Sequence, residues 1–325
     1  MTASTPSQNL QSLPLGIIFA LVAAAANASM SASVKALSGE LPTTTIVFFR
    51  FLFSFSCVLP WVIRDPNFSF KVTNPWRYGV RITAALGAIT CTFAAVQIAP
   101  LTSVLLLGST TPLFIPVLAA ILLKTKTHIS VWTGIGIGFM GVGIVLHPNA
   151  AFFQNAGELL ALAAGFLAAI AILQLRILSK NHAPLQLLFY YYGVSAIVMG
   201  LISSLNWRWP TTPRDWLVLT GVGLFSTIFQ VCATFSIVRA PSRIITPLSF
   251  TRVVWGGILD YFIWGIAPDI TTAIGFSVVV VGIVMVIYFG QRHIMPAPQS
   301  SSPHSVAVQD STQPDETQAS SANQP

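Results

Sequence analysis

The sequence predicts an all-α integral membrane protein with ten transmembrane helices, arranged as two inverted five-helix repeats. Three observations predict this fold class: the scarcity of charge, the number of long apolar segments, and a match between the two halves of the chain. Only 8% of the 325 residues are charged, whereas 54% are hydrophobic and the mean hydropathy is +0.75. Because soluble domains carry about 25% charged residues, most of this surface must face lipid.

Ten apolar segments are long enough to cross the hydrocarbon layer, which requires about 20 helical residues. The connections are short, and backbone groups in lipid must be satisfied within each segment, which favours helices over strands. In chain order the predicted spans are Leu15–Val34, Thr43–Ile63, Tyr78–Ile98, Thr102–Leu123, Ile129–Leu146, Gly157–Leu178, Leu185–Leu205, Trp216–Val238, Ile244–Trp264 and Ile270–Phe289.

The second half of the chain repeats the first at an offset of 141 residues. The offset aligns residues that are rare or structurally special: Gly16 with Gly157, Lys35 with Arg176, Ala99-Pro100 with Ala240-Pro241, Gly134 with Gly275, and Gly141 with Gly282. Each repeat holds an odd number of spans, so the second repeat enters the membrane from the opposite side. Such inverted repeats are typical of secondary transporters. We expect the repeats to cover residues 15–147 and 157–290.

Basic residues predict the orientation. With the N-terminus in the cytoplasm, ten basic residues fall on the inner side and three, Lys35, Arg208 and Arg214, on the outer side. Cytoplasmic loops carry the excess of Lys and Arg, so both termini are expected to be cytoplasmic in a multi-pass protein of the cell inner membrane. The N-terminal segment is residues 1–14, and the tail at 296–325 is rich in Ser, Gln and Pro, which predicts disorder.

Several function classes are excluded by the same composition. Lys and Arg stand singly or in pairs between apolar segments, so the formal charge of +7 forms no nucleic-acid-binding face. The three cysteines lie in apolar segments, and the five histidines lie in loops, at segment ends or in the tail, which provides neither metal ligands nor a nucleophile with its base. No phosphate-binding P-loop is present. We therefore expect no enzyme and no cofactor.

Short motifs in a characteristic order add a family resemblance. They include Phe48-Phe49-Arg50-Phe51, Arg81, Thr111-Pro112-Leu113-Phe114 and the segment from Ala240 to Leu248. Together they resemble the drug/metabolite transporter superfamily, specifically its ten-helix EamA-type members, from Leu15 to Phe289. The resemblance implies a carrier of small metabolites with a central cavity between the two halves. Such proteins commonly carry a Glu after the fourth and ninth helices, which is missing here, so substrate and coupling ion do not follow from the resemblance.

Ionisable groups inside a membrane are costly and usually functional, and four lie well within the predicted spans: Arg50, Arg81, Arg252 and Asp260. Arg252 lies about 12 Å deep at 1.5 Å per residue, so it either faces the cavity or pairs with Asp260. Arg50 is either a cavity residue or a structural one. Arg81 either faces the cavity, or extends to the nearby membrane surface or packs within the protein. Three guanidinium groups against one carboxylate favour a carboxylate-bearing substrate, with Asp260 as a candidate for ion coupling.

Uncharged side chains within the spans extend the candidate substrate site: Asn27, Gln97, Gln230, Tyr191 and Trp255. Each polar group either contacts substrate or forms an interhelical hydrogen bond. Trp255 lies three residues after Arg252 and therefore on the same face, where it either stacks on a planar substrate or simply packs.

Prolines and glycines predict how two spans are shaped. Pro112 and Pro116 predict a bend in the fourth span, which either serves as a hinge or is purely structural. Gly134 and Gly138 form a G-x-x-x-G motif, typical of close helix packing within the fold or between the protomers of a homodimer.

These observations predict a secondary transporter that moves a small polar metabolite, carboxylate-bearing such as an amino acid or derivative, by alternating access. A uniporter, an exchanger and a proton-coupled carrier all fit the sequence. The alternative class is a channel or a membrane subunit that does not transport. The expected partners are the small-molecule substrate and the lipid bilayer, with no nucleic acid.

Overall fold

The computed structural model describes residues 13–66, 68–123, 129–146, 156–179, 182–239, 248–267 and 269–292. Within these ranges the chain forms helices and no strand. The helices are α1 (Leu13–Ala36), α2 (Thr43–Arg64), α3 (Pro75–Ile98), α4 (Leu101–Gly108), α5 (Thr111–Leu123), α6 (Ile129–Leu146), α7 (Ala156–Leu178), α8 (Pro184–Ser204), α9 (Pro213–Arg239), α11 (Thr251–Trp264) and α12 (Ile270–Arg292). The predicted tail and residues 1–12 lie outside the described residues.

These helices confirm the predicted fold class. Eight segments are long and apolar enough to span a membrane, and α6 adds a shorter apolar helix from Ile129 to Val145. The ninth predicted span is represented by α11, and its first residues, 244–247, lie outside the described part of the chain. The predicted fourth span is confirmed as one membrane span from Leu101 to Ile121, and the structure adds a short interruption at Ser109 and Thr110 between α4 and α5.

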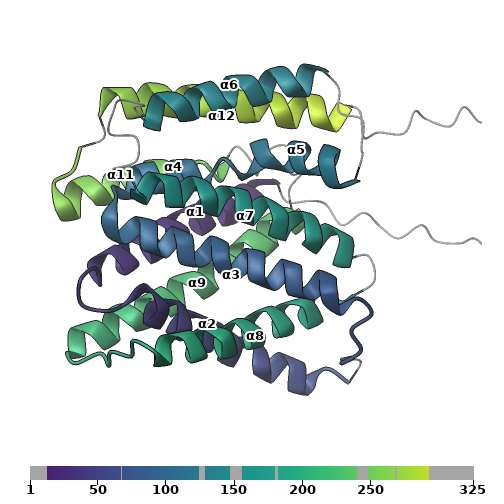
Figure 1. Ribbon diagram of the computed structural model, residues 1–325, viewed down its shortest axis with the longest axis vertical. Helices are drawn as coiled ribbons and strands as arrows, with labels where there is room; N and C mark the ends of the chain where they lie inside the picture. The colour runs from purple at the N-terminus through teal and green to yellow at the C-terminus, as the bar shows by residue number, and fades with distance from the viewer. Residues whose placement is uncertain are drawn as a thin grey trace, which may run out of the picture.

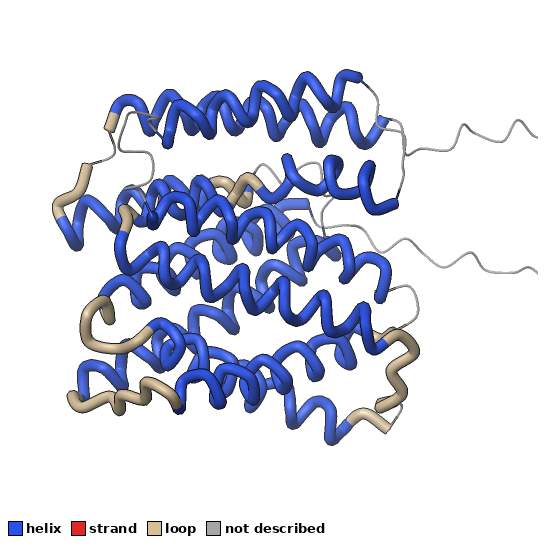
Figure 2. The backbone as a smooth tube through the Cα atoms, in the orientation of Figure 1, coloured by secondary structure: helices blue, strands red, loops and turns tan. Residues whose placement is uncertain are grey.

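The helices cross one bundle from end to end, with their connections gathered at two opposite ends (Figures 1 and 2). The connections that follow α1, α3, α8 and α11 lie at one end, which we call the Lys35 end. The connections that follow α2 and α7 lie at the opposite end, which we call the Arg64 end. The first residues of α1 and the last residues of α12 also lie at the Arg64 end.

Helix packing follows the internal repeat. The offset of the two halves makes α1 equivalent to α7, α2 to α8, α3 to α9 and α6 to α12. In the bundle α1 packs against α9, and the equivalent helices α7 and α3 pack against each other. The other main contacts, α2 with α8 and α6 with α12, join equivalent helices directly. A two-fold relation between repeats of opposite orientation produces this pairing.

The α6–α12 pair is held together by the predicted glycines. A Cβ atom added to Gly282 would lie 2.4 Å from the backbone nitrogen of Gly138 and 2.8 Å from the carbonyl oxygen of Gly134. A Cβ atom on Gly141 would lie 2.6 Å from the backbone nitrogen of Val279. The two backbones therefore touch, as small residues allow in membranes, and the G-x-x-x-G motif packs within one chain.

We predict that Gly282→Ala lowers the free energy of unfolding in detergent by about 1–3 kcal/mol, the usual cost of overpacking, because the backbone of α6 cannot move aside. Gly143→Ala is the matched control on α6, since nothing lies within 4 Å of its added Cβ atom. For Gly143→Ala, the higher helix propensity of Ala should leave the free energy of unfolding equal or slightly higher. Equal unfolding midpoints for both variants would contradict the close crossing.

Candidate functional site

The break in the fourth span makes α4 a short helix, which begins at the Lys35 end and ends within the span. The helix α4 has only eight residues, and its N-cap, Pro100, offers no side-chain hydrogen bond. Helix ends leave N–H and C=O groups unpaired, and lipid supplies no substitute. The neighbouring helix α11 packs against α4, so closely that a Cβ atom on Gly256 would lie 2.6 Å from Leu105.

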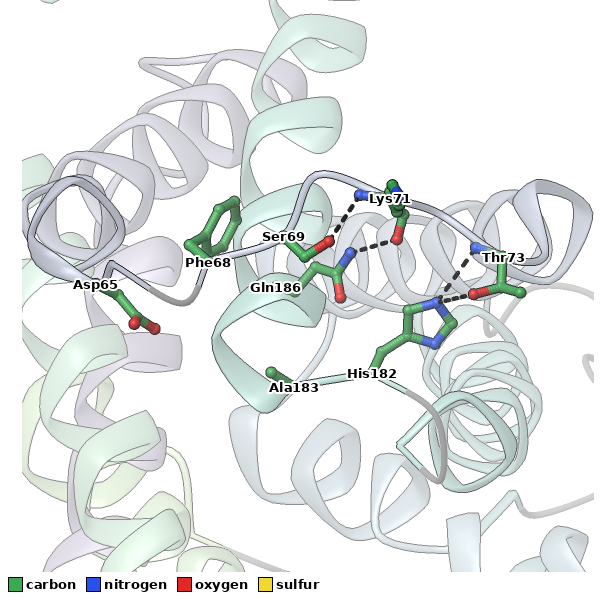
Figure 3. A pocket seen from close by; sticks show the side chains of 8 residues that line it. All are labelled: Asp65, Phe68, Ser69, Lys71, Thr73, His182, Ala183 and Gln186. Carbon is green, nitrogen blue, oxygen red and sulfur yellow. Dashed lines mark hydrogen bonds between the residues drawn. The ribbon is translucent and has the colours of Figure 1, made fainter.

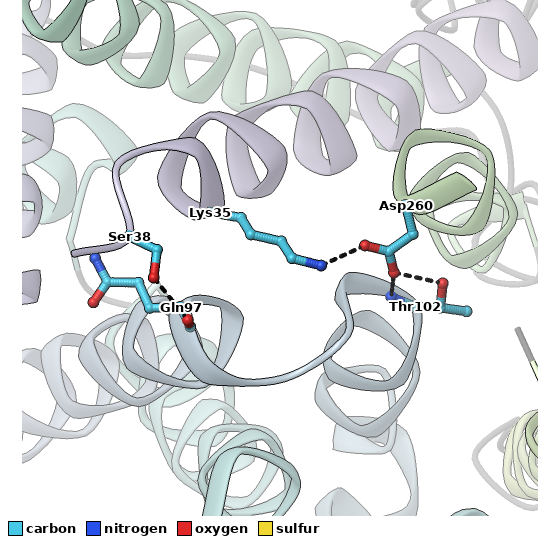
Figure 4. A network of polar contacts seen from close by, with 5 residues as sticks. All are labelled: Lys35, Ser38, Gln97, Thr102 and Asp260. Carbon is cyan, nitrogen blue, oxygen red and sulfur yellow. Dashed lines mark hydrogen bonds and ion pairs between the residues drawn. The ribbon is translucent and has the colours of Figure 1, made fainter. Parts of the chain in front are cut away.

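Asp260 of α11 binds the first turn of α4. Its carboxylate accepts hydrogen bonds from the backbone nitrogen of Thr102 at 2.9 Å and from the Thr102 hydroxyl at 3.0 Å. The second carboxylate oxygen lies 2.6 Å from Lys35 Nζ of α1, as Figure 4 shows. The Lys35 ammonium also lies 4.4 Å from the ring centroid of Trp264. Asp260 is fully buried, and this contact joins three helices at the Lys35 end.

Arg252 of α11 binds the other end of α4. Its Nε and Nη2 atoms donate to the Ser109 hydroxyl oxygen at 2.9 and 2.7 Å. The same hydroxyl donates to the carbonyl oxygen of Leu105 in the last turn of α4. Within the described residues, Arg252 has no acidic partner.

The two charges of α11 therefore bracket α4. They lie eight residues apart, about 12 Å along a helix, which matches the length of α4. The acid lies at the N-terminus of α4 and the base at its C-terminus, which are the signs that stabilise each end of a helix dipole. This arrangement decides one open alternative: Asp260 pairs with Lys35, and Arg252 does not pair with Asp260.

A second cluster contains Arg50 of α2, Arg81 of α3 and Tyr191 of α8. Arg50 is 5% exposed, and its Nε and Nη1 atoms have no hydrogen-bond partner. Its guanidinium carbon lies 5.1 and 5.7 Å from the ring centroids of Phe51 and Phe93, and it interacts with the Tyr191 phenol. Aromatic faces compensate only part of the cost of burying a cation.

Arg81 approaches the same tyrosine from the Arg64 end. Its guanidinium carbon lies 5.6 Å from the ring centroid of Tyr191, and its Nη1 atom donates to the carbonyl oxygen of Leu187 at 3.0 Å. Arg81 is only 6% exposed. Arg81 is therefore packed inside the bundle, where its guanidinium lies near Tyr191, and its role in substrate binding stays a prediction.

The remaining predicted site residues are placed differently. Gln97 accepts from the Thr43 hydroxyl at 2.7 Å and donates to the Leu41 carbonyl oxygen, so it holds the α1–α2 connection. Asn27 is buried on α1, Gln230 is half-buried on α9, and Trp255 is 42% exposed on α11. Within the described residues no hydrogen bond joins these three side chains to the arginines. Their role in substrate binding stays a prediction.

The prolines lie just beyond the break. Pro112 occupies the first turn of α5, where a missing N–H group costs nothing, and Pro116 lies inside α5. The break itself is stabilised by hydroxyl groups, because Thr111 donates to the carbonyl oxygens of Gly108 and Gly165. Whether the break serves as a hinge stays a prediction.

A polar pocket of about 270 Å³ lies at the Arg64 end, between the α2–α3 connection and the start of α8 (Figure 3). Gln186 donates to the Lys71 carbonyl oxygen at 2.8 Å, and the backbone nitrogen of Thr73 donates to His182 Nε2 at 3.4 Å. Gln186 directly precedes Leu187, the partner of Arg81. The pocket is therefore lined by residues of both repeats, and one of them, Gln186, is adjacent in sequence to the residue that accepts from Arg81.

Sequence reasoning missed Lys35, Thr102 and Ser109 as site residues. Lys35 ends its span and was interpreted only as a basic residue of a loop, while a Thr or Ser in a membrane helix usually bonds to its own backbone. The available signal was Asp260: a buried acid needs a cation, and Lys35 is a basic residue near the same predicted membrane surface.

Comparison with known proteins agrees with this geometry. The model of the EamA-like transporter family matches residues 14–147 and 155–288, once for each repeat. The chain belongs to the EamA-like transporter family, which confirms the resemblance to the drug/metabolite transporter superfamily. It is a multi-pass inner-membrane transporter of small molecules and not an enzyme.

Three relatives with named activities cover most of the chain. An S-adenosylmethionine uptake transporter of Rickettsia bellii is 28% identical over 86% of this chain and 95% of its own. A pseudopaline exporter of Pseudomonas aeruginosa is 24% identical over 84% and 95%. A riboflavin transporter of Vibrio cholerae is 22% identical over 84% and 90%. These relatives thus include one uptake transporter and one exporter, named for chemically different metabolites.

We predict that Ser109→Ala lowers the free energy of unfolding by about 1–3 kcal/mol, the cost of leaving a buried donor unpaired, because Arg252 loses its acceptor. Ser56→Ala is the control, since Ser56 is exposed on α2 and its hydroxyl donates only to Leu52 within the same helix. Denaturant titrations in detergent measure both variants. An unchanged midpoint for Ser109→Ala would show that Arg252 does not depend on this contact.

Proposed function

We propose that this transporter moves a small polar metabolite bearing a carboxylate, such as an amino acid or an amino-acid derivative, by alternating access between its two repeats. The observation that carries the proposal is the environment of Arg50. A buried guanidinium with two unbonded nitrogen atoms is costly unless a charged partner binds it. A substrate carboxylate would supply that partner.

The chemistry of the arginine cluster supports an anionic group. A guanidinium presents a planar fork of donors that matches a carboxylate, and Arg50 and Arg81 approach Tyr191 together. Within the described residues, neither arginine takes part in an ion pair. The one acid deep in a span, Asp260, is already paired with Lys35. The surroundings of this cluster are therefore positive.

The position of the cluster supports alternating access. Arg50 and Arg81 come from the first repeat and Tyr191 from the second, and secondary transporters bind substrates at such repeat interfaces. The polar pocket at the Arg64 end includes Gln186, which is adjacent in sequence to the residue that accepts from Arg81. We include it as the route by which substrate reaches Arg81 from that side. Arg252, whose only polar partner within the described residues is Ser109, is the further candidate contact.

The relatives support the coarser part of the proposal. S-adenosylmethionine, named for one relative, is an amino-acid derivative with a carboxylate, whereas riboflavin, named for another, has no carboxylate. Membership of the family therefore supports a small metabolite, and the arginine cluster supports the carboxylate.

We also propose that the Arg64 end faces the cytoplasm. Arg64, Lys71 and Arg77 belong to that end, and Arg208 and Arg214 belong to the Lys35 end. The positive-inside rule favours this orientation. It would place both chain termini in the cytoplasm, since α1 begins and α12 ends at the Arg64 end.

We predict that Arg50→Gln and Arg81→Gln each reduce uptake of a carboxylate substrate into proteoliposomes by about 10- to 100-fold, because a hydrogen bond to a charged group contributes about 1.5–3 kcal/mol. A panel of radiolabelled amino acids and S-adenosylmethionine identifies the substrate by saturable, exchangeable uptake. The amide analogue of that substrate should not be carried.

Arg214→Gln is the control for surface charge, because Arg214 is exposed at the Lys35 end. It should transport as the parent does. If the Arg50 and Arg81 variants both fold and take up the substrate as fast as the parent protein, the carboxylate proposal is contradicted.

A further inference from the structure

The Lys35–Asp260–Thr102 contact is the one strong polar attachment described between α1 and the α4–α11 pair. Lys35 Nζ lies 2.6 Å from the Asp260 carboxylate, and their side chains are 10% and 1% exposed. Asp260 also holds Thr102 at the start of α4. Figure 4 shows Lys35 extending from the end of α1 to this carboxylate, which lies between α4 and α11. The contact thus joins elements of both repeats at the Lys35 end.

The same attachment has no counterpart in the other repeat. The offset of 141 residues places Arg176 at the position equivalent to Lys35, and Ala119 at the position equivalent to Asp260. Arg176 is exposed, and Ala119 cannot form an ion pair. The glycine crossing of α6 and α12, in contrast, uses matched residues from both repeats.

This asymmetry has a thermodynamic consequence. In an inverted repeat, the two open states interconvert when the repeats exchange conformations, so identical repeats would give both states the same free energy. The Lys35–Asp260 pair, which the equivalent positions Arg176 and Ala119 cannot form, removes that equality. Breaking a buried pair leaves uncompensated charges in a medium of low polarity, so the state closed at the Lys35 end is favoured.

We propose that the Lys35–Asp260–Thr102 contact is the gate of the Lys35 end: it must break for that end to open, and it holds the resting protein closed there. Opening that end separates α1 from the α4–α11 pair, while the Arg252–Ser109 contact keeps α11 attached to α4. The proposal rests on the alternating access of the proposed function, but not on the identity of the substrate.

Accessibility of a reporter cysteine tests the gate directly. Ser31 lies one turn before Lys35 on the same face of α1 and is 1% exposed. In a background without Cys57, Cys91 and Cys232, Ser31→Cys is labelled with a membrane-impermeant maleimide added from either side. Lys35→Gln and Asp260→Asn should each raise the labelling rate from the Lys35 side about tenfold, since minor states hold about 0.1–10% of a population.

Two matched controls distinguish opening of the gate from a general destabilisation of the fold. Lys35→Arg keeps the cation and should keep the slow labelling. Glu40→Gln removes a second ion pair of the Lys35 end, Arg214–Glu40 at 3.4 Å, whose side chains are 68% and 42% exposed. Such exposed pairs contribute little, so its labelling rate should equal that of the parent.

The outcomes distinguish this proposal from the proposed function. Faster labelling from the Lys35 side alone supports the gate, whatever the Arg50 and Arg81 variants transport. Unchanged labelling in folded Lys35→Gln and Asp260→Asn, or faster labelling from both sides, overturns it. If the single variants do not fold, Lys35→Met/Asp260→Leu removes both buried charges together, and it must show the same one-sided increase for the gate to stand.

Discussion

A helix that ends inside the hydrocarbon layer must find partners for its terminal backbone groups, and this requirement organises the centre of the protein. The break at Ser109 and Thr110 creates such ends in the fourth span. Local hydroxyl groups and Arg252 bind the chain at the break, and Asp260 binds the opposite end of α4, beside the α3–α4 connection at the Lys35 end. The charges that are most costly in lipid are therefore the ones that make a short internal helix stable.

Symmetric packing and asymmetric chemistry have separate roles in this fold. Glycine pairs related by the repeat bring α6 and α12 into backbone contact, and the main helix contacts occur as pairs related by the repeat. Charged contacts do not follow the repeat: Lys35 binds Asp260 at one end, and Arg50 and Arg81 lie in the first repeat only. A duplicated scaffold thus supplies two similar halves, and unmatched charges distinguish the Lys35 end from the Arg64 end.

Much of the fold could be predicted from the sequence, because a segment that crosses lipid must be long, apolar and helical. Segment length, charge scarcity and the offset of the halves predicted ten spans and their inverted order. The depth of Arg50 and Arg252 within their spans singled out both residues, and their role in substrate binding stays a prediction. Pro112 indicated an irregularity close to the true break, although the break lies earlier, where the hydroxyl groups of Thr110 and Thr111 bind the carbonyl oxygens of Leu107 and Gly108.

The sequence by itself determined the class of protein, the number of spans and their duplication, because hydrophobicity and segment length act locally along the chain. Only the tertiary structure decided the partners of the buried charges. Lys35 and Asp260 are 225 residues apart, and Arg252 and Ser109 are 143 apart. No local pattern encodes such pairs, because a charge in lipid binds the nearest polar group that packing brings to it, and packing depends on every helix at once.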